Sequence, residues 1–138
     1  MRIPWKKRIT GMRKVLQAYK IIENRLPSTY PRPLIILHLN QDQFHQYWKT
    51  DKLSSETYDY LPDSFIDTES GALHIHLGMW EDNMDTIISL LLHELGHLMA
   101  FQRFKSNDPR NNDTDASEKY AWTFSNRWYK IMKKEGLF

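Results

Sequence analysis

The sequence contains no cysteine, no long hydrophobic run and no internal repeat, and each absence excludes a class of structure. Without cysteine there are no disulfides and no thiolate zinc sites, so any bound metal must be held by histidines and carboxylates. No apolar run approaches the roughly 20 residues that a helix needs to span a bilayer. The basic N-terminus lacks the apolar stretch and small-residue cleavage site of a secretory signal. We therefore expect a cytoplasmic protein without a membrane span.

What the chain does contain is typical of one packed globular domain. It has 138 residues, of which 41% are hydrophobic, and five tryptophans. A chain of this length buries about two-thirds of the surface that it exposes when unfolded. We predict a single domain over residues 1–138 and a monomer.

Positive charge is concentrated near the N-terminus, although the formal net charge of the chain is only +2. Residues 1–32 hold nine lysines or arginines and a single acid, Glu23. Such a run is usually a solvated helix face or an intramolecular partner for the acidic remainder. It can also steer nucleic acid, an acidic protein or anionic lipid to the molecule. Nucleic-acid binding through residues 2–25 is therefore an alternative and not the leading prediction.

Hydrophobic periodicity predicts an N-terminal helix and a small sheet. The helix covers residues 5–26 and is ended by Pro27. The branched apolar run 34–39 predicts a strand with His38 in the core, and residues 44–48 predict a short helix before a loop over 51–63. Alternating runs predict a hairpin of residues 65–68 and 72–77. His74 and His76 share one face of it, either as an exposed polar face or as a pair that can bind metal or substrate. The apolar stripe expected on the N-terminal helix consists of Trp5, Ile9, Met12, Leu16, Tyr19, Ile22 and Leu26.

Two further helices complete an expected α+β fold with a small mixed sheet. The first covers residues 86–104, with Asp82, Asn83 or Asp85 as its N-cap. A polar breaker over 106–114 separates it from a helix over 115–134, which Gly136 ends as a C-cap.

The most informative segment is His93-Glu94-Leu95-Gly96-His97 in the first of these two helices. It matches the H-E-x-x-H zinc signature, in which a spacing close to one helical turn brings two imidazoles onto one stripe. The opposite face is apolar, so the helix is buried and its polar stripe must face a cleft or a partner. The alternative is two core histidines hydrogen-bonded to their neighbours, with Glu94 on a solvated edge. The polar stripe also carries small residues, namely Thr86, Ser89, Gly96 and Ala100.

Glycine in the middle of a helix costs about 1 kcal/mol relative to alanine. Gly96 therefore predicts that another group passes close to the helix, either a strand or a ligand.

A catalytic zinc site needs a third protein ligand and an open position. Glu118 is the best candidate because it follows His97 by 21 residues, at the start of a helix that can pack antiparallel to the first. Asp115 and Glu118 also fit a capping box, in which Glu118 would only satisfy a backbone N–H. Asp115 is the fallback ligand.

The motif His93-Glu94-Leu95-Gly96-His97, followed by Glu118-Lys-Tyr-Ala121, resembles the gluzincin pattern of H-E-x-x-H plus E-x-x-A. Within that group the chain is similar to the minigluzincins and the ImmA/IrrE-like metallopeptidases, over residues 64–129. The resemblance implies a zincin-like fold, with Zn²⁺ bound by His93, His97 and Glu118 and with Glu94 as the general base. Such families commonly place Asp or Asn four residues after the ligand glutamate, where this chain has Trp122. Asp115, Asn126 or a backbone oxygen is therefore expected to partner a metal histidine.

These features together predict a zinc-dependent endopeptidase acting on peptide or protein substrates. A zinc-activated water would attack the scissile carbonyl and Glu94 would transfer its proton to the leaving amine. The alternative is a metal-stabilised regulatory or binding module with little or no turnover. The enzyme would be latent if the basic N-terminal segment or residues 136–138 covered the cleft. The candidate oxyanion donors are Tyr58, Tyr60, Tyr129, His74 and His76.

Overall fold

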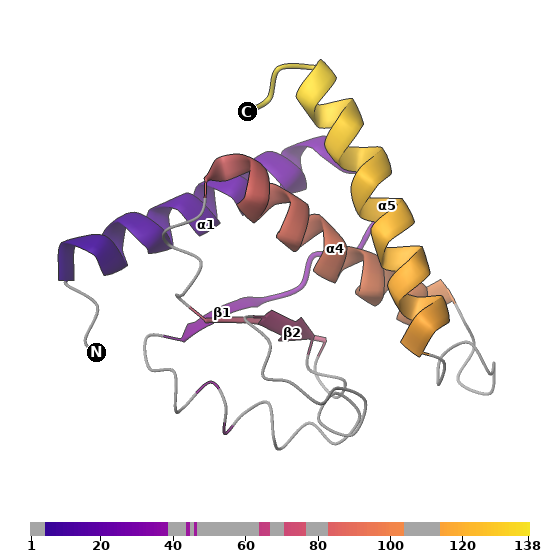
Figure 1. Cartoon of the computed structure of the whole chain (residues 1–138), viewed down its shortest axis with the longest axis horizontal. Coiled ribbons are helices and arrows are strands. Elements are labelled where there is room, and N and C mark those ends of the chain that lie inside the picture. The colour runs from indigo at the N-terminus through magenta and orange to yellow at the C-terminus, as the bar shows by residue number, and fades with distance from the viewer. Residues whose placement is uncertain are drawn as a thin grey trace. The chain divides into compact units, whose positions relative to one another are not determined.

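A computed structural model of the chain describes residues 5–38, 44, 46, 64–66, 71–76, 83–103 and 114–138. Its elements are α1 (Trp5–Arg25), β1 (Ile35–His38), β2 (Ser64–Ile66), β3 (Leu73–His76), α4 (Met84–Arg103) and α5 (Thr114–Lys134) (Figure 1). The α+β class is therefore as predicted. Of the predicted short helix at 44–48, Phe44 and Gln46 have helical backbone, whereas the predicted loop 51–63 lies outside the described residues.

The chain divides into two compact units, which we describe separately. One comprises Met1–Gln17 and Pro33–Asp82 and carries the sheet. The other comprises Ala18–Arg32 and Asn83–Phe138 and carries α4 and α5. Among the described residues, no helix combines the length and the apolar character that a membrane span requires.

The sheet has three strands in the order β1-β3-β2. Strands β2 and β3 pair antiparallel, which confirms the predicted hairpin, and Ser64 lies opposite Ile75. Strand β1 pairs with β3 in parallel, with Ile35 opposite Leu73. Gly71, just before β3, has φ of +73°, which side-chain-bearing residues rarely adopt.

The central position of β3 corrects the prediction of an exposed histidine face. His74 is only 2% exposed. Its Nδ1 lies 2.7 Å from Nε2 of His38, and the two imidazole rings stack with centroids 5.0 Å apart. His38 is thus the buried and hydrogen-bonded core residue that the sequence predicted. The prediction failed for His74 because the parallel partner β1 comes from a distant part of the chain.

The buried positions of helix α1 and of the residue after it overlap the predicted stripe at Ile22 and Leu26 and differ from it before them. The fully buried side chains of α1 include Val15, Ala18 and Ile22, whereas Leu16 is 51% exposed. The helix ends where the guanidinium of Arg32 donates hydrogen bonds to the carbonyl oxygens of Glu23, Leu26 and Pro27 at 3.0–3.2 Å. The bond to Glu23 satisfies a carbonyl group of the kind that the last turn of a helix leaves without a partner.

Part of the N-terminal positive charge has an intramolecular partner. The Nε atom of Arg25 lies 2.6 Å from the carboxylate of Glu135, and its guanidinium lies over the ring of Trp128 at 5.2 Å. Arg25 thus has the acidic partner within the protein that the sequence suggested for this charge, whereas Arg32 donates to backbone carbonyl oxygens.

Helices α4 and α5 lie side by side and run antiparallel (Figure 1). Asp85 near the start of α4 contacts Tyr129 late in α5, and the Ser125 hydroxyl donates to the Ser89 carbonyl at 3.0 Å. The ends agree with the sequence: the Asn83 side chain accepts the amide of Thr86, and Gly136 follows α5 with φ of +71°. Most of α4 is buried, including Ile87, Ile88, Leu91, Leu92, Leu95 and Leu98, as the apolar pattern predicted.

A polar cluster joins the N-terminal end of α4 to the C-terminal end of α5. The Asp85 carboxylate accepts hydrogen bonds from Lys133 Nζ at 2.7 Å and the Tyr129 hydroxyl at 3.0 Å. These two bonds lower the pKa of Asp85 below its ordinary value of 3.8, and the bond from Lys133 has the larger effect. A carboxyl group with a lowered pKa stabilises the fold above its ordinary pKa and ceases to do so as the pH falls through the lowered value.

We expect Asp85→Asn to lower the melting temperature slightly at neutral pH, because the amide cannot hold the Lys133 charge. The difference from the parent protein should shrink as the pH falls below 3.8. Thermal unfolding at a series of pH values measures this, with Tyr129→Phe as a control that removes one hydrogen bond and keeps the Asp85 charge. A difference that stays constant across the acid range would contradict the assignment.

Candidate metal centre

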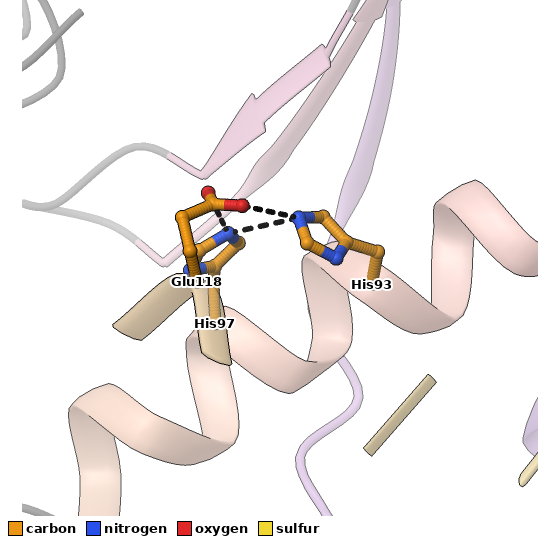
Figure 2. A group of neighbouring side chains, drawn as sticks. All are labelled: His93, His97 and Glu118. Carbon is orange, nitrogen blue, oxygen red and sulfur yellow. Dashed lines mark hydrogen bonds and ion pairs between the residues drawn. The ribbon is translucent and has the colours of Figure 1, made fainter. Parts of the chain in front are cut away.

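Two histidines from α4 and one glutamate from α5 converge on a single point (Figure 2). The Nε2 atoms of His93 and His97 lie 3.1 Å apart. One Glu118 oxygen lies 2.8 Å from Nε2 of His97 and the other lies 3.3 Å from Nε2 of His93. Donor atoms that hold one tetrahedral zinc at about 2.0–2.1 Å lie roughly 3.3 Å from one another. The three side chains therefore already have the spacing of a metal cage.

A direct contact between helix backbones places Glu118 near the histidines. A Cβ atom added to Gly96 would lie 2.8 Å from the Cα atom and 3.0 Å from the carbonyl oxygen of Ala121. Such distances are far inside van der Waals contact, so only glycine fits there. The close approach expected at Gly96 is present, but its source is α5 and not a strand or a ligand. Ala121 follows Glu118 by one helical turn, so this contact sets how near the carboxylate comes.

The two histidines differ in their affinity for protons. Burial, together with the charge of the neighbouring His97, lowers the pKa of His93 to about 4, although the Glu118 carboxylate acts to raise it. Burial also acts to lower the pKa of His97, but the hydrogen bond to Glu118 and the charges of Glu94 and Glu118 outweigh it and raise that pKa. At neutral pH His93 is therefore neutral and presents a lone pair, whereas a metal at His97 competes with a proton.

Glu94, the candidate general base, is 9% exposed and lies between the two histidines in the sequence of α4. Its charge contributes to raising the pKa of His97, so its carboxylate lies within electrostatic reach of the site. The alternative of Glu94 on a solvated edge does not agree with this burial.

The remaining imidazole nitrogens have different surroundings. The Nδ1 atom of His97 lies 2.8 Å from the hydroxyl of Ser117, the residue before Glu118. The Nδ1 atom of His93 is buried and has no hydrogen-bond partner among the described residues. Against the His93 ring lies Trp122, with centroids 4.3 Å apart. Sequence reasoning named Asp115, Asn126 or a backbone oxygen as the partner of a histidine and missed Ser117. A hydroxyl next to the candidate ligand was the available signal.

The structure describes only some of the other candidate residues. Asp115, the fallback ligand, is exposed and is not in the metal-binding group found among the described residues. Of the candidate oxyanion donors, Tyr129 donates its hydroxyl to Asp85 and His74 is bonded to His38. Tyr58 and Tyr60 lie outside the described residues, and His76 pairs with His38 in the sheet register.

The C-terminal segment does not cover the three side chains. The Phe138 ring contacts Tyr129 at 5.5 Å and lies under the Lys133 ammonium group at 4.8 Å. These residues follow Glu118 by three to four turns of α5, about 16 Å or more along the helix axis. The segment therefore folds onto the end of α5 opposite Glu118, and latency through the basic N-terminal segment or residues 136–138 stays a prediction.

The donor set can be tested against the chemistry of metal ions. Two imidazole nitrogens and one carboxylate oxygen suit zinc, which takes three protein ligands in catalytic sites, and they suit hard cations such as Mg²⁺ or Ca²⁺ poorly. His93, His97 and Glu118 are also the only group of three or more such side chains with convergent donor atoms in the described part of the chain. The residues present thus fit zinc.

Comparisons with protein-family models, with curated proteins and with solved structures found no match for this chain, so the functional argument depends on the sequence motif and the site geometry.

Proposed function

We propose that this chain is a zinc-dependent peptidase whose metal ligands are His93, His97 and Glu118. The observation that carries the proposal is the convergence of two imidazole Nε2 atoms and one carboxylate, all within 4.8 Å of one another. The two histidines belong to α4 and the glutamate to α5. Within the motif, Glu94 follows His93 and is the glutamate that peptide hydrolysis needs. Three ligands leave a fourth tetrahedral position for water or substrate.

Each residue of the proposed site has a separate role. His93, His97 and Glu118 hold the metal, and Ser117 fixes the ring of His97 through Nδ1. Zinc, when bound, would supply a Lewis acid that lowers the pKa of water toward 7 and polarises a carbonyl group. Glu94 takes a proton from the attacking water and then gives it to the nitrogen of the leaving amine, so that the C–N bond breaks and a carboxylic acid and an amine are released. Peptides and proteins are the proposed substrates.

The second function considered is a regulatory or binding module that keeps the metal and has no turnover. No contact in the described residues favours it over the peptidase, and both Arg25 and Arg32 are engaged within the protein. Nucleic-acid binding through residues 2–25 stays a prediction.

Zinc content and its dependence on Glu118 test the proposal directly. We expect the purified protein to bind one zinc ion per chain by mass spectrometry and to cleave casein or library peptides only when loaded. Glu118→Gln keeps the shape of the side chain but removes a charged ligand, so we expect zinc affinity to fall more than about 100-fold. This exceeds the usual effect of losing a group that only hydrogen-bonds to a metal ligand. Glu135→Gln, the same change at the residue that pairs with Arg25, should leave affinity unchanged. A parent protein that binds no zinc would overturn the proposal.

A further inference from the structure

The two candidate zinc histidines are held in unequal ways. The Nδ1 atom of His97 has the Ser117 hydroxyl at 2.8 Å. The Nδ1 atom of His93 is buried, and the described residues supply it with no hydrogen-bond partner. A histidine that binds metal through Nε2 carries its proton on Nδ1, and this N–H normally donates to a carboxylate, a carbonyl or water. His93 therefore lacks the partner that its role calls for.

Trp122 is the residue that lies against this ring. It follows Glu118 by one turn of α5, and its indole is centred 4.3 Å from the His93 imidazole at an angle of 46° between the planes. The indole nitrogen can only donate a hydrogen bond, so it cannot accept the Nδ1 proton. The face of the indole carries a partial negative charge and accepts N–H groups weakly.

The side chain of Trp122 is 53% exposed, so its own burial does not explain its position. A large aromatic residue that leaves half its surface in water gains less from burial than one in the core. The contact with the His93 ring is the interaction of Trp122 that the structure shows.

We propose that Trp122 is a positioning residue for the metal centre, whose indole face holds the His93 ring and receives its Nδ1–H. This proposal rests on the proposed zinc site. A π face is a weaker acceptor than a carboxylate or an amide oxygen, so the indole raises the electron density at Nε2 less than such oxygens would. The centre therefore binds zinc more weakly than the same ligands would with an oxygen acceptor beside His93.

Substitutions at position 122 separate the indole face from simple packing. Trp122→Phe keeps an aromatic face, Trp122→Leu keeps only apolar bulk, and Trp122→Asn and Trp122→Gln place an amide oxygen there at two lengths. We expect zinc affinity, measured by chelator competition, to stay within about threefold for Phe and to fall more for Leu. Zinc affinity should rise about tenfold or more for Trp122→Asn, Trp122→Gln or both. Tenfold is the lower end of the effect of groups that hydrogen-bond to a metal ligand.

A spectroscopic readout distinguishes positioning from a structural role. In zinc-loaded protein, the ring current of the indole should shift the Nδ1–H proton resonance of His93 upfield of that of His97. The Leu and amide variants should remove this shift, and circular dichroism checks that each variant is folded. A parent protein that binds zinc but shows no upfield shift, or whose affinity is the same in all four variants, overturns the proposal for Trp122 alone. A parent protein that binds no zinc overturns the zinc site and this proposal together.

Discussion

Glu94→Gln should lower the rate of peptide hydrolysis by about 10²–10⁴-fold while the protein still binds zinc, because this range is what a positioned general base contributes. Glutamine matches the shape of glutamate, but its amide cannot take a proton from water. The glutamate is not among the three convergent donors, so metal content should not change. Rates on casein or a library peptide, measured beside zinc content on the same sample, test both halves of this expectation.

The comparison needs a control for a contaminating protease and for general damage. Glu135→Gln carries the same chemical change at the residue that pairs with Arg25 and should retain the parent rate. If Glu94→Gln hydrolysed peptide as fast as the parent, Glu94 would not be the base. If the parent bound zinc without hydrolysing any peptide, the regulatory module would become the better interpretation.

Gly96→Ala should reduce both the stability of the fold and the affinity for zinc. The added methyl group would lie 2.8 Å from the backbone Cα atom of Ala121, and no side-chain rotation can move a backbone atom away. The helices must separate, which typically costs about 1–3 kcal/mol. The gain in helix propensity is only about 0.5–1 kcal/mol, so the loss prevails. Because Glu118 lies one turn before Ala121, the separation also withdraws the carboxylate from the histidines.

A matched substitution shows whether zinc affinity falls for this reason. Gly136 follows the other end of α5 with φ of +71°, and a Cβ atom there would meet nothing within 4 Å. Gly136→Ala should cost about 1 kcal/mol through backbone strain and leave zinc affinity unchanged. Urea unfolding of metal-free protein and chelator competition measure the two quantities. A Gly96→Ala protein with parent zinc affinity would show that the helix contact does not position Glu118.

The local part of the fold could be predicted because it depends on residues near one another in the sequence. Periodicity placed the three long helices within about two residues of their ends. Cap chemistry named Asn83 as one of three candidates for the N-cap of α4 and Gly136 as the C-cap of α5. The alternation around Gly71 was enough for the hairpin.

The errors concern packing between distant segments. The burial of His74 depends on a parallel strand more than 30 residues away, which no local pattern contains. The buried positions of α1 include Val15 and Ala18, whereas the predicted stripe included Leu16, which is 51% exposed.

The sequence predicted the candidate metal ligands but not the residues that contact them. The spacing of His93 and His97 is a property of one helix, and a third donor could be sought from the requirements of zinc. The contacts of Ser117 with His97 and of Trp122 with His93 depend on the rotation of α5 about its axis. At Gly96 the sequence predicted a close approach, but not that the backbone of α5 at Ala121 would make it.

Contact between two main chains has a consequence for the choice of ion. Where helices are spaced by side chains, a change of rotamer can widen the gap, but no rotamer separates Gly96 from Ala121. The spacing of the two helices beside the three donors is therefore nearly constant. In the proposed site, any adjustment to an ion larger than zinc, such as cadmium, would have to come from the side chains of the ligands and not from the helices.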